Sequence, residues 1–152
     1  MSVKKQLRNV LGGFVNFPTL MSHLGVEDPL ALVIRGHMYV EAALIKQIES
    51  ALVNKNAFDI AKLNFPTKIT IAVALGKVDI ADARGFTALN TLRNKFAHDV
   101  QMTLTNQHEL DLYNALSPSQ REMIKAPRKA QTMVLHRLRF DVISLIANAA
   151  NP

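Results

Sequence analysis

The stretch GKVDIADARGFTALNTLRNKFAHD, residues 76–99, carries the signals that decide the fold. Gly76 is a favourable residue just after the end of one helix, and Asp79 is a favourable N-cap for the next. Asp82 falls in the first turn, where a negative charge suits the helix macrodipole. The spacing of apolar residues therefore predicts a helix over residues 80–97. Its core-facing side chains are expected to be Phe86, Leu89 and Phe96.

A second long helix is predicted upstream, where Asp28 is followed by Pro29. Aspartate is a preferred N-cap, and proline is favoured in the first helical turn. This helix is expected to run to about Val53. One apolar face is predicted to comprise Leu30, Val33, Ile34, Leu44, Ile45, Ile48 and Leu52.

The remaining segments also have helical rather than alternating apolar spacing. Helices are predicted at residues 3–11, 67–75, 106–115, 118–125 and 128–149, and residues 14–26 are expected to be a connector with about one turn of helix. Ser117, Pro118 and Gln120 form a capping-box pattern before the 118–125 helix. Core residues expected in the last helix are Met133, Leu138, Ile143, Leu145 and Ile146.

These elements together predict an all-α bundle with three long helices, one medium helix and short connecting helices. A chain of 152 residues is long enough for one domain with its own core. We expect one domain over residues 1–152, with an N-terminal helix and connector at 1–27 and the bundle at 28–150.

The composition, 49% hydrophobic and 20% charged, excludes an intrinsically disordered protein. The chain has no cysteine, which excludes disulfides and thiolate zinc sites. Asn16 and Pro18 interrupt the apolar run near the N-terminus, so a signal peptide is not expected. No run approaches the roughly 20 apolar residues of a membrane span. The expected location is the cytoplasm, with no membrane partner.

A net charge of +6 favours polyanionic partners, chiefly RNA or DNA. The alternative is that many soluble proteins are basic without such a role. Six basic residues against Glu122 alone lie between residues 121 and 139, and Lys4, Lys5 and Arg8 form a second cluster. Either is a candidate track for phosphates or simply a solvated helix face. The candidate RNA-binding residues are Lys95, Arg121, Lys125, Arg128 and Lys129.

His37 and Glu41 interrupt the apolar face of the helix that starts at Pro29. They are four residues apart, so they lie one above the other. One interpretation is that they satisfy each other or lie at a rim facing water, because a buried carboxylate needs a partner. The other is that Glu41 reaches across the bundle to orient Arg93 or His98. Two ligands at this spacing are too few to indicate a metal site, and no metal or cofactor is expected.

Arg93, Asn94 and His98 gather at the end of the predicted 80–97 helix. Asn94 and His98 share a helix face, whereas Arg93 and His98 lie about 140° apart at normal helical pitch. They form either a solvated helix end, with Arg93 paired weakly to Asp82 or Asp99, or a phosphate site. Two copies related by a two-fold axis could close this polar corner into a cleft.

The segment LRNKFAHD, residues 92–99, resembles the R-x-x-x-x-H motif of the HEPN superfamily, including the polar residue that follows the arginine. Residues 68–99 are similar to the mannitol-repressor-like branch of that superfamily. There a helix ending in ALG precedes a short link and the motif helix. The helix containing RGHMYVEAALIKQIESAL also resembles the opening helix of that branch. The resemblance covers about residues 28–100.

The resemblance implies a dimeric α-helical bundle in which two motifs face each other and cleave RNA without metal, as toxins or defence components do. Arg93 and His98 take the motif positions, Asn94 the polar position, and Glu41 a supporting position. The chemistry expected is attack by the 2′-hydroxyl, with His98 moving a proton and Arg93 binding phosphate. The alternative is a non-catalytic, mannitol-repressor-like regulatory module that binds protein or RNA. A third option is an antitoxin-type binder of another protein.

Overall fold

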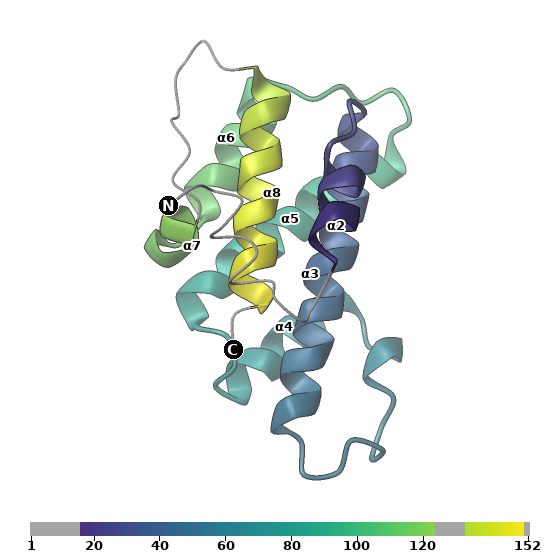
Figure 1. Ribbon diagram of the computed structural model, residues 1–152, viewed down its shortest axis with the longest axis vertical. Coiled ribbons are helices and arrows are strands. Elements are labelled where there is room, and N and C mark those ends of the chain that lie inside the picture. The colour runs from purple at the N-terminus through teal and green to yellow at the C-terminus, as the bar shows by residue number, and fades with distance from the viewer. Residues whose placement is uncertain (1–15, 124–132, 151–152) are drawn as a thin grey trace.

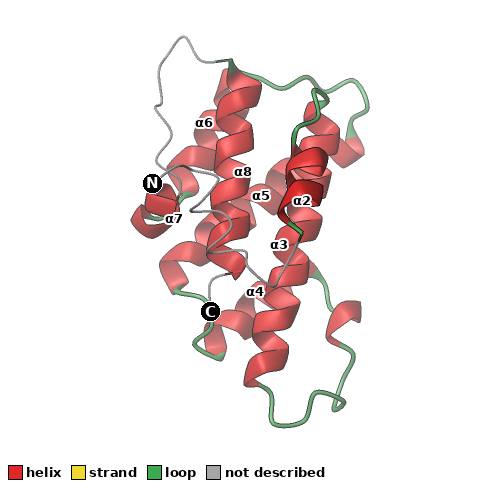
Figure 2. Ribbon diagram, in the orientation of Figure 1, coloured by secondary structure: helices red, strands yellow, loops and turns green. Residues whose placement is uncertain are grey.

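The computed structural model describes residues 16–123 and 133–150, and these residues form helices and loops without a strand (Figure 2). The predicted all-α bundle is therefore confirmed. The helix expected at residues 3–11 lies outside the described residues, as do residues 128–132 of the predicted last helix.

Three long helices form the centre of the bundle: α3 (Pro29–Ala51), α5 (Ile80–His98) and α8 (Val134–Ala150). Figure 1 shows α3 and α8 side by side, and α3 packs against α8 more extensively than against any other helix. A Cβ on Gly36 would lie 2.2 Å from Cγ1 of Val142, so only glycine permits this close approach. The core between the long helices therefore depends on a residue with no side chain.

Local capping signals in the sequence correctly located the starts of α3 and α5. The Asp28 side chain accepts a hydrogen bond from the Leu30 N–H at 3.0 Å, and Asp79 accepts one from the Ala81 N–H at 2.8 Å. Gly76 has a φ of 71°, the left-handed conformation that glycine adopts without strain after a helix end. The observed ends of α3 and α5 differ from the predicted ends by two residues and one residue.

Shorter helices complete the bundle. They are α4 (Phe65–Ala74), α6 (Asn106–Ala115), α7 (Pro118–Met123) and a 3-10 turn, η1 (Ile60–Lys62), which the sequence did not predict. The predicted capping box before α7 is present. Ser117 N–H donates to Oε1 of Gln120 at 3.0 Å, and Gln120 N–H donates to the Ser117 hydroxyl at 3.1 Å.

The expectation of a connector at residues 14–26 was wrong, because α2 (Phe17–Leu24) makes two turns there. The Asn16 side chain caps this helix, accepting from the Thr19 N–H at 3.2 Å. Leu20 and Leu24 are fully buried, and α2 packs against α3. These two leucines thus bury one face of α2.

Individual core predictions also needed correction. Met133 is 65% exposed instead of buried, whereas the other four residues expected in the last helix are buried. On α3 the fully buried positions include Leu32 and Val40. The predicted residues that are only partly buried are Leu30, Ile34, Ile45 and Leu52. None of the helices in the described ranges is both long and apolar enough to cross a membrane.

Candidate functional site

The motif residues occupy the last two turns of α5, which continues through His98. The helix does not end before the histidine, so Arg93 and His98 project about 140° apart around its axis. Arg93 and Asn94 are half-buried, and His98 is exposed. One copy of the chain therefore presents the guanidinium and the imidazole in different directions.

The Arg93 guanidinium is held by its neighbour in sequence. Its Nη1 donates to Oδ1 of Asn94 at 3.1 Å. No ion pair joins Arg93 to a carboxylate within the described residues, so its positive charge is available to an anionic ligand. Asn94 thus orients the arginine.

The two carboxylates considered as partners for Arg93 are both engaged elsewhere. Asp82 is buried and accepts hydrogen bonds from the Ser117 hydroxyl and, at 3.0 Å, from Nδ2 of Asn148. Asp99 accepts from the Gln101 N–H at 2.9 Å in the turn after α5. The interpretation of Arg93 as part of a weak ion pair with either residue is therefore wrong.

Glu41 has a partner that the sequence analysis did not identify. Nζ of Lys68, from α4, donates to Oε1 of Glu41 at 2.6 Å and to the Ala61 carbonyl at 3.3 Å. The Lys68 side chain is 1% exposed and the Glu41 side chain 31%. The expectation that Glu41 bonds Arg93 or His98 is not met, because its carboxylate compensates a buried lysine charge.

His37 is buried beside this ion pair but bonds to a different residue. Its Nε2 and Oδ1 of Asn90, on α5, are 3.0 Å apart, and its ring lies 4.1 Å from the Phe65 ring between centroids. The interpretation that His37 and Glu41 satisfy each other by hydrogen bonding was therefore wrong. The charges of Glu41, Arg93 and Lys68 all act on the His37 imidazole, which places these groups in one polar cluster between α3, α4 and α5.

Burial lowers the pKa of His37 below its usual value of 6.5, more than the Asn90 hydrogen bond and the Glu41 charge raise it. The folded chain therefore takes up this proton less readily than the unfolded chain. We expect the free energy of unfolding to fall as the pH drops below 6.5, because the unfolded state binds more protons there. Well above pH 6.5 both states hold His37 neutral, and this contribution no longer changes with pH.

The measurement is urea unfolding of the wild type and His37→Gln at several pH values between about 8 and 5. The glutamine keeps a hydrogen-bonding group for Asn90 but takes up no proton. Below pH 6.5 the free energy of unfolding of His37→Gln should fall less steeply than that of the wild type. Equal slopes in the two proteins would contradict the assignment of a neutral, buried His37.

The expected basic track over residues 121–139 is largely absorbed by packing where the structure describes it. Arg121 lies 4.5 Å above the Tyr113 ring and donates to the Tyr113 carbonyl at 3.1 Å. Arg137 pairs with the buried Glu109 at 3.3 Å, and Arg139 donates to the Leu24 carbonyl at 2.8 Å. Arg137 and Arg139 are therefore held by groups of the protein itself, whereas Arg121 is exposed and stays a candidate RNA-binding residue.

The other expected phosphate contacts have different outcomes. Lys95 is exposed on α5, in keeping with a role in binding. Lys125, Arg128 and Lys129 lie outside the described residues, as does the N-terminal cluster of Lys4, Lys5 and Arg8.

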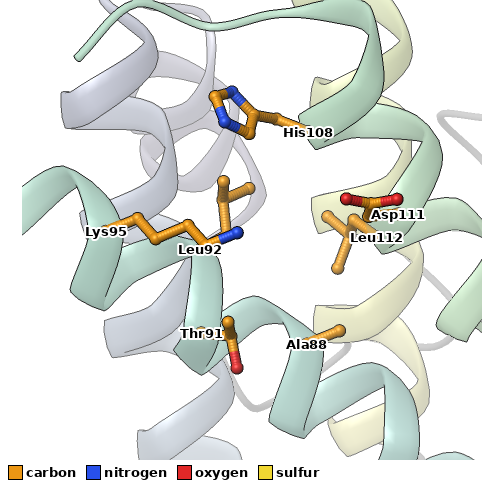
Figure 3. Close-up of a pocket in the computed structure, with 7 residues that line it drawn as sticks. All are labelled: Ala88, Thr91, Leu92, Lys95, His108, Asp111 and Leu112. Carbon is orange, nitrogen blue, oxygen red and sulfur yellow. The ribbon is translucent and has the colours of Figure 1, made fainter.

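A pocket of about 220 Å³ lies between α5 and α6 (Figure 3). Lys95, on α5, and His108 and Asp111, on α6, provide its charged and polar groups, while Leu92 and Leu112 provide apolar walls. Of these polar groups, Lys95 alone is a candidate binding residue on sequence grounds. The signal was weak, because His108 and Asp111 look like ordinary polar positions of a short surface helix.

The sequence around Lys68 carries a clearer indication of a buried charge. It falls between Phe65, Ile69 and Ala72, which are all buried at helical spacing on α4. A lysine on such a face predicts a paired buried charge. Among the described residues no three His, Asp or Glu side chains are grouped as they would be to hold a metal ion.

No family model, curated protein or solved structure matches this chain.

Proposed function

We propose that this protein is a cytoplasmic, metal-independent endoribonuclease of the HEPN type that acts as a homodimer, in the manner of a toxin or defence component. The observation that carries the proposal is the continuation of α5 through His98. Because Arg93 and His98 then diverge, one copy offers two half-sites, and a second copy is needed to bring a guanidinium and an imidazole to one phosphate. The exposed His98 is accessible to such a partner.

The proposed reaction needs only the groups at this corner. The neutral imidazole of one His98 takes the proton from an RNA 2′-hydroxyl while the 2′-oxygen attacks the adjacent phosphorus. The bond from phosphorus to the 5′-oxygen breaks, and the same imidazole returns the proton to that leaving oxygen, so His98 ends neutral. Arg93, held by Asn94, stabilises the negative charge on the phosphorane. The products are a 2′,3′-cyclic phosphate and a 5′-hydroxyl.

The test is digestion of a mixed-sequence RNA by the purified dimer in EDTA, followed by analysis of the product ends. We expect cleavage that yields cyclic phosphates and stops where the 2′-hydroxyl is replaced by hydrogen. A DNA strand of the same sequence serves as the control and should stay intact. RNA that survives long incubation with the dimer would overturn the proposal.

A second candidate is a non-catalytic regulatory module similar to the mannitol-repressor-like proteins. The observation that favours it is that Glu41 pairs with Lys68, and that Arg137 and Arg139 bind groups of the protein itself. Fewer groups are then free for RNA than the net charge suggests. The motif would support a dimer interface or a contact with a regulatory protein or cognate antitoxin.

Arg93→Ala separates the two candidates. A regulatory module should lose dimerisation or partner binding with this substitution and have no nuclease activity to lose. Light scattering after gel filtration measures the dimer directly. Unchanged association of Arg93→Ala would count against the regulatory module, whereas loss of RNA cleavage by an intact dimer would support the nuclease.

A further inference from the structure

The pocket between α5 and α6 adjoins the face of α5 that carries His98. Lys95 precedes His98 by three residues and Thr91 precedes it by seven, so all three lie on about the same face of the helix. Arg93 is turned about 200° away from Lys95 on this helix. An RNA strand lying against Asn94 and His98 would therefore pass the mouth of the pocket.

Two hydrogen-bond donors face the pocket from opposite helices. Figure 3 shows the Lys95 side chain extending across the pocket from α5 and the His108 ring above it on α6. The Thr105 N–H donates to Nδ1 of His108 at 3.2 Å in the capping box that begins α6. Neutral His108 must then carry its hydrogen on Nε2, which leaves that nitrogen as a donor.

The Asp111 carboxylate supplies a hydrogen-bond acceptor to the same pocket. Gln107 Nε2 donates to Oδ1 of Asp111 at 2.6 Å, which fixes the carboxylate and leaves Oδ2 for a ligand. No ion pair joins Lys95 to Asp111 in the part of the chain that the structure describes, although both line the pocket. The two charges are thus separated by space that a ligand can occupy.

The size and walls of the pocket restrict the ligand class. A volume of about 220 Å³ is below the roughly 300–1,000 Å³ of sites for drug-sized molecules. A single flat ring system fits such a volume better than a whole nucleotide. Leu92 and Leu112 supply apolar surface for its faces, and the polar groups contact its edges.

We propose that the α5–α6 pocket binds a guanine base of the RNA substrate, a proposal that rests on the nuclease function for its biological setting. Guanine presents O6 and N7 as adjacent acceptors, the edge that lysine most often recognises, and Lys95 and His108 supply donors for them. Its N1–H and amino group are donors that suit the Asp111 carboxylate. Adenine would turn its amino group toward the Lys95 ammonium, so two donors would meet.

The test begins with binding of free nucleotides, which requires no cleavage. We expect guanosine monophosphate to shift the amide NMR signals of Lys95 and His108, and adenosine monophosphate to shift them much less. Asp111→Asn should weaken binding of the guanine nucleotide roughly tenfold, because one good base-edge contact is lost. Asp59→Asn is the matched control, since Asp59 is an exposed helix cap outside this pocket that loses the same charge.

The second arm maps the cut positions in RNA. Wild-type protein should cut at a fixed position relative to guanosine, and Asp111→Asn should cut with less base preference. Equal binding of the two nucleotides, or cleavage without regard to guanosine, would overturn the pocket proposal and leave the nuclease proposal standing. Selective guanine binding by a protein that cuts no RNA would support the pocket and refute the nuclease.

Discussion

His98→Ala is expected to reduce the rate of RNA cleavage by roughly 10²- to 10⁴-fold, the usual contribution of a positioned general acid or base. The imidazole is the group at this corner that can both accept and release a proton during the reaction. His98 is exposed at the last position of α5, so its truncation removes no core packing. The measurement is the initial rate of RNA cleavage in EDTA, with the thermal melting temperature recorded for both proteins.

His136→Ala is the matched control, because His136 is an exposed histidine on α8 that is hydrogen-bonded to Arg139. It should cleave RNA at the wild-type rate. An undiminished rate in His98→Ala, or an equal loss in both variants, would remove His98 from the reaction.

Glu41→Ala is expected to destabilise the fold by about 3 kcal/mol, because it leaves the Lys68 ammonium buried without its counter-charge. Breaking a buried pair commonly costs about 3–5 kcal/mol, and the partial exposure of Glu41 places this pair at the lower end. In a domain of this size the melting temperature should fall by roughly 6–12 °C. Urea unfolding of the wild type and the variant measures the free energy directly.

Two further variants test whether loss of the ion pair with Lys68 causes the destabilisation of Glu41→Ala. Glu49→Ala removes a half-buried acid from the same helix, and it should change stability by no more than about 0.5 kcal/mol. The double variant Glu41→Leu with Lys68→Met should recover most of the loss, since apolar replacement of a buried pair is often neutral. If Glu41→Ala is as stable as Glu49→Ala, Glu41 does not hold the lysine in place.

Any effect of Glu41 on the site is therefore expected to arise first from its contribution to the stability of the fold. At a temperature where Glu41→Ala is partly unfolded, a loss of nuclease activity would reflect unfolding. It would not show that Glu41 takes part in the reaction. Activity compared at a temperature where both proteins are folded would reveal any additional effect through the nearby Arg93, whose charge shares the His37 environment.

The sequence predicted most of the helices because their start and stop signals are local. Asp28, Asp79 and the pair Ser117 and Gln120 each bond to a backbone group within three residues, so no knowledge of the tertiary fold was needed. A local start signal is present at α2 as well, because Asn16 caps it, but the buried face of α2 and the exposure of Met133 have a different cause. Burial of Leu20 and exposure of Met133 are set by neighbouring helices, which local patterns do not describe.

The candidate site was predictable only in part for the same reason. The spacing of Arg93, Asn94 and His98 on α5 follows from helical geometry and could be stated in advance. The partner of Glu41 lies 27 residues along the chain on another helix. His108 and Asp111 come to line the same pocket as Lys95 because α6 packs on α5. Contacts of this kind depend on how helices pack, which spacing within one helix does not determine.

The most direct test of the account is a subunit-mixing experiment with Arg93→Ala and His98→Ala. Each variant alone should be inactive, because every composite site lacks one kind of group. After unfolding and joint refolding, about half of the dimers should be mixed, and each holds one intact Arg93 facing one intact His98 across the two-fold axis. The account predicts that the mixture recovers RNA cleavage, up to about a quarter of the wild-type rate. A mixture in which mass spectrometry detects the mixed dimer but RNA stays uncut would contradict the composite site.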